Sequence, residues 1–343
     1  MRANGDDALA GLLRKAGVGG TPEMPLALAG GRNNRVYRLE TTDGPVFLKQ
    51  YHRGGDWDRL AAESRFLRFC EKRGVNRVPL LLAEDRENAL ALHSWIVGGR
   101  PDPETAGGAG MRGAADFLRD LAGASSGKDG NAPPARDACL CLEDFFRSPR
   151  ERLRDLAVAL ERRTDEGPLP GRVVDAAACF LRKVLFPYWE EVRDVARARL
   201  GTADLSAPFP GRELIFSPSD FGFHNVLMNG DGEPVFTDFE YAGLDDPAKA
   251  IGDFLCQADY VPGPAALGEL AGAVRRSAGE AAKLAERVAT LLPLFHVKFC
   301  CIILNDFKTA DAERRAFANL PAGVERVSAQ LRKAERYFRE RRP

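Results

Sequence analysis

The stretch SPSDFGFHNVLM at residues 217–228 sets polar residues at short spacing directly before an apolar run. Asp220 and Asn225 stand five positions apart, and the apolar run begins immediately after Asn225. A turn rich in Gly, Asp and Asn follows, and a second apolar run ends at Asp238. Because a hairpin brings the two ends of its strands together, we predict that Asp220, Asn225 and Asp238 converge.

These residue types suit phosphoryl transfer to a hydroxyl group. The transferring group carries negative charge, so a protein must orient the attacking hydroxyl and supply positive charge, usually as Mg²⁺. A carboxylate at Asp220 can accept the hydroxyl proton. An amide oxygen at Asn225 and a carboxylate at Asp238 are hard oxygen ligands of the kind that Mg²⁺ prefers.

The spacing from Asp220 to Asn225 also matches the D-x-x-x-x-N catalytic loop of the protein-kinase-like fold. SDFGFHNVL (219–227) and FTDFEYAGLDDP (236–247) resemble the catalytic and metal-binding segments of aminoglycoside phosphotransferases and choline kinases. The resemblance spans residues 26–255. It implies an α+β, protein-kinase-like fold with a small β-rich N-terminal lobe and a larger, mostly helical C-terminal lobe. It further implies a small-molecule kinase, with Asp220 as catalytic base and with Asn225 and Asp238 as metal ligands.

The resemblance assigns a phosphate-binding lysine to the N-terminal lobe. Lys49 ends the strand-like run VFLK (46–49), which is similar to the V-A-I-K strand of kinases. Lys49 would contact the α- and β-phosphates, and Glu63 on the following helix would hold it extended. Phe47 shares a strand face with Lys49 by alternation and would approach the base, where a smaller residue is usual.

Further nucleotide contacts are implied at the first strand turn and at a hinge. Glycines let backbone N–H groups approach phosphate oxygens, and the family has its phosphate-covering loop at this turn. The expected cofactors are ATP, with GTP as an alternative, and Mg²⁺. The residues implied are Gly30, Gly31 and Asn34 in the loop, and Ser94 and Ile96 in the hinge that meets the base.

Three features depart from the family pattern or invite a wrong alignment. Pro218 stands two positions before Asp220, where the family usually has a supporting histidine. The triplet DFG at 220–222 spells the magnesium motif of protein kinases, but no asparagine lies between Asn131 and Asn225 to form a catalytic loop upstream. Asp246 is expected to cap a helix that begins at Pro247. The acid that the family has soon after this proline is either displaced or lost, with Ala250 at its place and Asp253 nearby.

The order of predicted elements divides the chain into residues 1–97 and 98–343. The first part alternates strand-like runs with one helix, which we predict to start at a cap on Asp56 and to stop at Gly74. A glycine-rich break follows at 98–101. The second part is mostly helical with a strand-like island over 214–241. Its helices are predicted around 150–163, 171–200, 265–289 and 310–340.

Composition excludes several classes of protein. The chain has 343 residues with 49 basic and 49 acidic side chains, so nothing indicates a nucleic-acid partner. Its seven cysteines match no zinc pattern and are predicted to be buried, reduced thiols, which favours a cytoplasmic setting. No signal peptide and no apolar run long enough to span a bilayer is apparent. The expected partner is a small-molecule substrate with a hydroxyl group, and the oligomeric state is left open.

Alternatives remain open from the sequence. A pseudokinase that binds nucleotide and regulates a protein partner would have the same fold, and so would a nucleotidyl transferase. The acceptor could be a sugar, a glycan precursor, an aminoglycoside or an amino alcohol. Polycationic aminoglycosides need an acidic pocket, whereas the C-terminal part is rich in arginine and shows no acid-rich cluster beyond Asp245-Asp246 near the predicted site. Ser219 and His224 are interpreted as supports of the loop, with catalytic roles left open.

Overall fold

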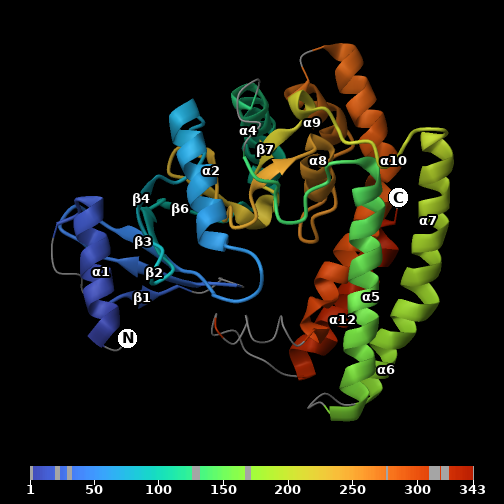
Figure 1. Cartoon of the computed structure of the whole chain (residues 1–343), viewed down its shortest axis with the longest axis horizontal. Coiled ribbons are helices and arrows are strands. Elements are labelled where there is room, and N and C mark those ends of the chain that lie inside the picture. Colours follow the sequence, from blue (N-terminus) through green and yellow to red (C-terminus); the bar gives the residue numbers. More distant parts are fainter. Residues whose placement is uncertain are drawn as a thin grey trace.

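The computed structural model describes residues 3–19, 24–28, 33–125, 132–166, 171–275, 277–308, 317 and 324–342. Figure 1 shows a small N-terminal region built on a sheet and a larger, mostly helical C-terminal region beside it. This arrangement agrees with the predicted α+β architecture. The nucleotide-binding residues proposed from the sequence lie in the N-terminal region and the catalytic and metal-binding residues in the C-terminal one, so the relative placement of the two regions decides the site.

The N-terminal sheet is antiparallel throughout its described strands, in the order β1-β2-β3-β5-β4. Helix α1 covers one face, where its Leu9, Leu12 and Leu13 belong to the same apolar cluster as Leu48 and Leu92 of the sheet. The sequence analysis did not predict α1, although those three leucines have helical spacing. The elements are α1 (Ala3–Ala16), β1 (Leu26–Ala27), β2 (Arg35–Leu39), β3 (Val46–Gln50), α2 (Arg59–Arg73), β4 (Leu81–Asp85) and β5 (Leu90–Ser94).

Helix α2 lies between the sheet and the C-terminal region. Its N-cap is Asp58, whose side chain accepts a hydrogen bond from the Ala61 amide at 2.9 Å, so the predicted cap at Asp56 is wrong by two residues. Gly74 ends the helix in a left-handed conformation, as predicted. Phe66 of α2 stacks on Phe239 of the C-terminal region with 4.4 Å between ring centroids. Helix α2 is therefore packed into the larger core.

The C-terminal region carries two small antiparallel sheets, β10-β7 and β6-β8-β9, within a shell of helices. The strand-like island predicted over 214–241 becomes β7, β8 and β9, and β10 follows it. Its elements are β6 (Gly98–Gly99), α3 (Pro103–Thr105), η1 (Ala106–Gly110), α4 (Met111–Ala124), α5 (Leu142–Glu166), α6 (Gly171–Phe180), η2 (Leu181–Leu185), α7 (Phe186–Leu200), η3 (Gly211–Glu213), β7 (Ile215–Ser217), η4 (Phe223–Asn225), β8 (Val226–Asn229), β9 (Pro234–Phe236), β10 (Gly243–Asp245), α8 (Pro247–Leu255), α9 (Ala266–Val274), α10 (Ala278–Ile303), η5 (Leu304–Phe307) and α12 (Val324–Arg341).

The predicted helices differ from the observed ones mainly at their ends. Helix α5 begins at Leu142, before the predicted start near 150, and the segment predicted as one helix over 265–289 is split into α9 and α10. Of the helix predicted over 310–340, the structure describes α12. Short helix boundaries of this kind are set by packing and capping that the apolar spacing alone does not show.

The glycine-rich break after β5 leads directly into the C-terminal sheet. Gly98 and Gly99 form β6 and pair with Asn229 and Met228 of β8. A Cβ atom at Gly98 would lie 1.9 Å from the Met228 carbonyl oxygen, so this close approach requires glycine. The lobe boundary between residues 97 and 98 stays a prediction.

Helix α10 is the one described helix long and apolar enough to cross a membrane, measured together with the turn that follows it. Within the 18-residue apolar stretch of this segment, 72% is buried inside the protein. Figure 1 shows α10 running through the helical region beside α5, α8 and α9. A core helix has these properties, so the finding is weak evidence for a membrane span.

The cysteines are free thiols, and five of the seven are buried. Cys141 is half-buried and Cys179 is exposed, so the prediction of buried thiols holds for the majority but not for these two. Burial raises the pKa of Cys301 to about 12 and that of Cys256 to about 12. These buried thiols are therefore protonated and act as small apolar side chains.

We expect acid to destabilise the protein partly through His296 on α10. Its ring is 1% exposed and lies between Tyr188 and Tyr337, and burial lowers its pKa to about 4. An unfolded histidine titrates near 6.5. The stability from keeping this ring neutral is complete above about pH 6.5 and is lost as the pH falls through about 4.

His296→Gln should remove this part of the pH dependence. At about pH 5 the variant should lose about 2 kcal/mol less than the wild type, relative to about pH 7.5. Urea unfolding at both pH values measures the difference. His93, buried with its pKa also lowered to about 4, adds a loss in the same direction that the variant keeps. Identical pH dependence in variant and wild type would contradict the prediction.

Candidate active site

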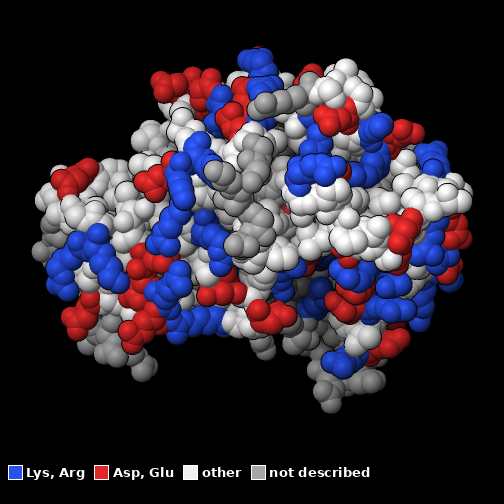
Figure 2. Space-filling model, turned by 45° about the horizontal axis from the view of Figure 1, so that its top comes forward, with Lys and Arg blue, Asp and Glu red and all other residues white. Residues whose placement is uncertain are grey.

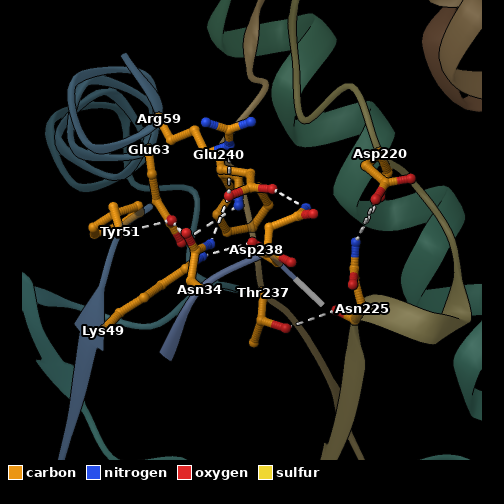
Figure 3. A network of polar contacts seen from close by, with 12 residues as sticks. Asn34, Lys49, Tyr51, Arg59, Glu63, Asp220, Asn225, Thr237, Asp238 and Glu240 are labelled. Carbon is orange, nitrogen blue, oxygen red and sulfur yellow. Dashed lines mark hydrogen bonds and ion pairs between the residues drawn. The ribbon is translucent and has the colours of Figure 1, made fainter. Parts of the chain in front are cut away.

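Lys49 bridges the two regions of the molecule (Figure 3). Its Nζ lies 2.7 Å from Glu63 Oε2 on α2 and 2.6 Å from Asp238 Oδ1, which follows β9. The Tyr51 hydroxyl donates to the same Glu63 oxygen at 2.8 Å. The Lys49–Glu63 pairing implied by the family resemblance is present in the structure, and Asp238, 189 positions from Lys49, joins it.

Alternation along β3 explains why Lys49 reaches this place. Leu48 packs toward α1, so its neighbour Lys49 points to the other face of the sheet, toward α2. Lys49 is 4% exposed. Burial alone lowers the pKa of Lys49, but Asp238 and Glu63 outweigh it, and the net direction is upward. The ammonium group is therefore charged and held between two acids.

Negative charge exceeds positive charge around Asp238. Burial raises the pKa of Asp238, Lys49 lowers it, and Glu240 and Glu63 raise it further, to about 7 overall. Asp238 also has a left-handed backbone, with a φ of +66°. An acid held in this way, with its charge only partly balanced by one lysine, provides a place where an added cation would be stabilised.

The hairpin formed by β8 and β9 brings Asn225 next to Asp238. Val226 pairs with Phe236, and one step further along the ladder the Thr237 amide donates to the Asn225 carbonyl at 2.8 Å. The Thr237 hydroxyl donates to the same carbonyl at 3.1 Å. This register places the backbones of Asn225 and Asp238 at neighbouring positions of the hairpin, which is the part of the predicted convergence that depends on the two strand-like runs.

Asp220 joins the same corner through its own loop. The Asn225 side-chain amide donates to the Asp220 carbonyl at 3.0 Å and to Asp220 Oδ2 at 3.3 Å. His224 Nε2 lies 3.2 Å from Asp220 Oδ1. Enclosure by the protein alone would raise the pKa of Asp220, but His224 and then Lys298 and Asn225 outweigh it, so the pKa is lowered. Asp220 is consequently ionised and 46% exposed at its side chain.

Glu240 is buried and makes several polar contacts, although its sequence motif predicted no role for it. Asn33 Nδ2 donates to Glu240 Oε1 at 2.5 Å, and Asn34 Nδ2 donates to Glu240 Oε2 at 2.6 Å. Arg59 Nε lies 3.6 Å from Oε2, and the Trp57 indole donates to the Glu240 backbone carbonyl at 2.7 Å. Glu240 thus ties the first strand turn and the start of α2 to the C-terminal region.

Replacing Glu240 should destabilise the protein measurably. Glu240→Gln keeps the size of the side chain but replaces one acceptor oxygen by a donor that faces Asn33 or Asn34, and it leaves Arg59 without its carboxylate. We expect a loss of about 2–4 kcal/mol in the free energy of unfolding. Urea unfolding measures it, with Glu71→Gln on the exposed face of α2 as the matched control. Equal stability of the two variants would show that Glu240 does not join the regions.

The remaining predicted nucleotide contacts lie in different surroundings. Gly30 and Gly31 fall outside the described residues. Asn34 is buried, donates to Glu240 and accepts a hydrogen bond from the His52 amide at 3.1 Å, so in this structure its side chain secures the turn. Ser94 pairs with Val46 in the sheet, and its hydroxyl accepts a hydrogen bond from the Leu80 amide at 2.9 Å. Asn34, Ser94 and Ile96 stay predictions as nucleotide ligands.

The acids considered for a polycation pocket are buried and paired. Asp245 and Asp246 are 0% and 1% exposed. Lys249 Nζ lies 3.1 Å from Asp245 Oδ2, and Arg287 Nη2 donates to Asp246 Oδ1 at 2.9 Å. Asp246 also caps α8 by accepting from the Ala248 amide, with Pro247 at the first helical position, as predicted. These two carboxylates have structural roles and do not offer a cation-binding surface.

A magnesium ion fits the donor set at this corner. Among the described residues no cluster of three or more His, Cys, Asp and Glu side chains could hold a metal. Mg²⁺ usually keeps several waters and takes one or two protein ligands together with substrate phosphates. Asn225 and Asp238 offer one amide oxygen and one carboxylate at adjacent positions of the hairpin. Glu240 and Glu63 add negative charge near Asp238 that Lys49 opposes.

Comparison with known families places the chain. A model described as the phosphotransferase enzyme family matches residues 26–288. The chain belongs to this phosphotransferase family. The match includes Lys49, Glu63, Asp220, Asn225 and Asp238, and so contains the whole candidate site. No curated protein matches the chain significantly.

Solved structures of kinases share the fold. The choline kinase of Cryptosporidium parvum Iowa II is 11% identical, with a TM-score of 0.58, over 97% of this chain and 96% of that one. A choline/ethanolamine kinase family protein of Mesorhizobium loti is 21% identical, with a TM-score of 0.54, over 96% and 98%. Spectinomycin phosphotransferase, solved with ADP and spectinomycin, is 12% identical, with a TM-score of 0.54, over 95% and 98%. The predicted protein-kinase-like fold and family resemblance are confirmed.

Proposed function

We propose that this phosphotransferase is an ATP-dependent kinase that moves the γ-phosphoryl group to a hydroxyl of a small molecule. The observation that carries the proposal is the Lys49 bridge, which joins Glu63 and Asp238 across the two regions within 2.7 Å and 2.6 Å. Asp238 follows the second strand of the hairpin and Asn225 precedes the first, so both lie at its open end. The Asn225 side chain contacts Asp220. A triphosphate bound between Lys49 and Asp220 would have the lysine at one end and, at the other, the carboxylate that takes the proton of the substrate hydroxyl.

The chemistry assigned to each residue follows from its surroundings. Lys49 is charged and would bind the α- and β-phosphates, with Glu63 holding it extended. Asp220 has a lowered pKa, so it is a weak base that orients the acceptor hydroxyl by accepting its hydrogen bond and takes the proton late in the transfer. Asn225 and Asp238 would hold Mg²⁺, which supplies positive charge to the phosphate oxygens.

The acceptor is proposed to be a small hydroxyl compound: a sugar, a glycan precursor, an aminoglycoside or an amino alcohol. Structural neighbours are described as kinases of choline and ethanolamine and as a phosphotransferase of spectinomycin. Asp245 and Asp246 are buried and paired, so these two acids would not bind a polycationic acceptor. On the face shown in Figure 2, basic and acidic side chains are interspersed.

A product-resolved kinase screen tests the proposal. Purified protein is incubated with Mg-ATP or Mg-GTP and a panel of sugars, aminoglycosides and amino alcohols, and ADP or GDP formation is followed. Mass spectrometry of the product then separates an added phosphate from an added nucleotide. We expect magnesium-dependent transfer of one phosphate to at least one acceptor. Nucleotide binding without turnover across the panel would contradict a kinase, and transfer of a nucleotide would contradict phosphoryl transfer.

A further inference from the structure

The backbone before Asp220 has a conformation that its residues do not favour. Ser219 has a φ of +66°, in the left-handed region. For an L-residue other than glycine this region costs about 1–2 kcal/mol. The Ser219 amide donates to Ser217 Oγ at 3.1 Å, and the Asp220 amide donates to the Pro218 carbonyl at 3.0 Å. The orientation of the Asp220 side chain therefore depends on an unfavourable turn that other contacts must stabilise.

Lys249 of α8 contacts this turn from inside the protein. Its Nζ donates to Ser219 Oγ at 3.0 Å, and both side chains are buried, at 3% and 5% exposure. The same ammonium group lies 3.1 Å from Asp245 Oδ2 and 3.4 Å from Asp253 Oδ2. Asp253 in turn accepts a hydrogen bond from Lys298 Nζ at 2.6 Å. Lys249 is thus held by carboxylates of β10 and α8, and Lys298 of α10 binds one of these carboxylates.

The contact with Ser219 is more than charge compensation. Burial lowers the pKa of Lys249, but Asp245 and Asp253 outweigh it, and the net direction is upward, so the group is charged. Its two carboxylates already balance that charge, whereas the hydroxyl of Ser219 is neutral. Pro218, two positions before Asp220, carries no polar side chain, and Lys249 adds a polar contact to the loop from a separate element of the fold.

We propose that Lys249 is a positioning residue for phosphoryl transfer, because its hydrogen bond to Ser219 holds the left-handed turn that presents Asp220 to the acceptor hydroxyl. This inference rests on the proposed function. Lys249 acts through Ser219 and does not itself touch the reacting atoms. A purely structural Lys249, needed only to neutralise Asp245 and Asp253, would affect stability and leave the turnover of folded protein unchanged.

A double-mutant cycle separates the two roles. Ser219→Ala removes the hydroxyl and keeps Lys249 with both carboxylates, so its fold should be retained. We expect kcat for ADP formation from Mg-ATP, with an acceptor from the screen, to fall about 10- to 100-fold, since small displacements of a catalytic group have effects of this size. The KM for ATP should stay within about 2-fold. In the Ser219→Ala background, Lys249→Met should lower kcat no further.

Two more variants complete the test. Ser219→Gly lacks the hydroxyl but adopts a positive φ without steric cost, so it should keep more of kcat than Ser219→Ala. Lys183→Met, at an exposed position, is the control for loss of a lysine. If Lys249→Met does not fold, the difference in kcat between Ser219→Ala and Ser219→Gly still tests whether the hydroxyl holds the turn. Wild-type kcat in Ser219→Ala, equal losses in the Ala and Gly variants, or a further fall in the double variant would overturn the inference.

Failure of the inference can be told apart from failure of the proposed function. A wild-type protein that shows no Mg-ATP turnover with any acceptor contradicts the kinase assignment. An active wild type whose kcat does not respond to Ser219→Ala contradicts only the role of Lys249. Thermal unfolding of each variant, measured in parallel, shows whether a change in kcat accompanies a loss of folded protein.

Discussion

Asp220→Asn is expected to lower kcat for phosphorylation of the acceptor by about 10²–10⁴-fold, with the KM for ATP nearly unchanged. Asparagine has almost the same shape and can still form a hydrogen bond with Asn225, but it cannot accept a proton as a carboxylate does. The side chain of Asp220 contacts His224 and Asn225 of its own loop, whereas the proposed phosphate site is built on Lys49 and Glu63. The loss should therefore appear in turnover and not in nucleotide affinity.

Steady-state kinetics with ATP and the acceptor varied separately measures this loss. Asp231→Asn, in the exposed turn between β8 and β9, is the matched control because it makes the same chemical change in the same hairpin. The control should have wild-type kcat. A kcat of Asp220→Asn within about 3-fold of the control would exclude Asp220 as the base.

Asp238→Asn is expected to reduce Mg-dependent turnover by about 10³-fold or more, because several kcal/mol of charge stabilisation depend on the metal. The substitution isolates the charge from the backbone. Asp238 has a φ of +66°, and asparagine tolerates this left-handed conformation whereas alanine does not. Asp231→Asn again serves as the control. Turnover comparable to the control would remove Asp238 from the metal site.

Nucleotide binding to Asp238→Asn should distinguish the proposed role of Asp238 in holding the metal from its contact with Lys49. Asp238 holds Lys49 at 2.6 Å, and an amide holds an ammonium group less strongly. Asp238→Asn should therefore bind metal-free ATP at least as tightly as the wild type, because Lys49 is more readily available. Added Mg²⁺ should strengthen binding to the wild type only. Titration calorimetry with EDTA and with Mg²⁺ measures both, and Mg²⁺-strengthened binding in the variant would contradict the assignment.

The sequence predicted the parts of the site that depend on local order. The strand, turn and strand after Asn225 specify a hairpin, and a hairpin with that turn places Asn225 beside Asp238 whatever surrounds it. The family resemblance implies the pairing of Lys49 with Glu63, which are 14 positions apart on a strand and the helix that follows it. Contacts of this kind follow from alternation and short connections.

Contacts between distant segments were not predicted, because periodicity carries no information about them. Glu240 binds Asn33 and Asn34 across 207 and 206 positions, and Lys249 reaches Ser219 across 30. A buried acid or lysine looks the same in sequence as an exposed one until its partner is known. The N-cap of α2 was misplaced for a different reason: Asp56 and Asp58 are both acceptable caps, and only the observed backbone of the helix start distinguishes them.

The docking of α2 into the larger core also bears on how independent the first part of the chain is. Phe66 and Phe69 of α2 pack against Phe216, and Phe66 stacks on Phe239 as well. A fragment ending at residue 97 would leave these rings in water, and their burial is worth about 1.5–3 kcal/mol for each side chain. The two regions therefore share part of their hydrophobic stabilisation, and we expect a fragment ending at residue 97 to be less stable than the same residues within the whole chain.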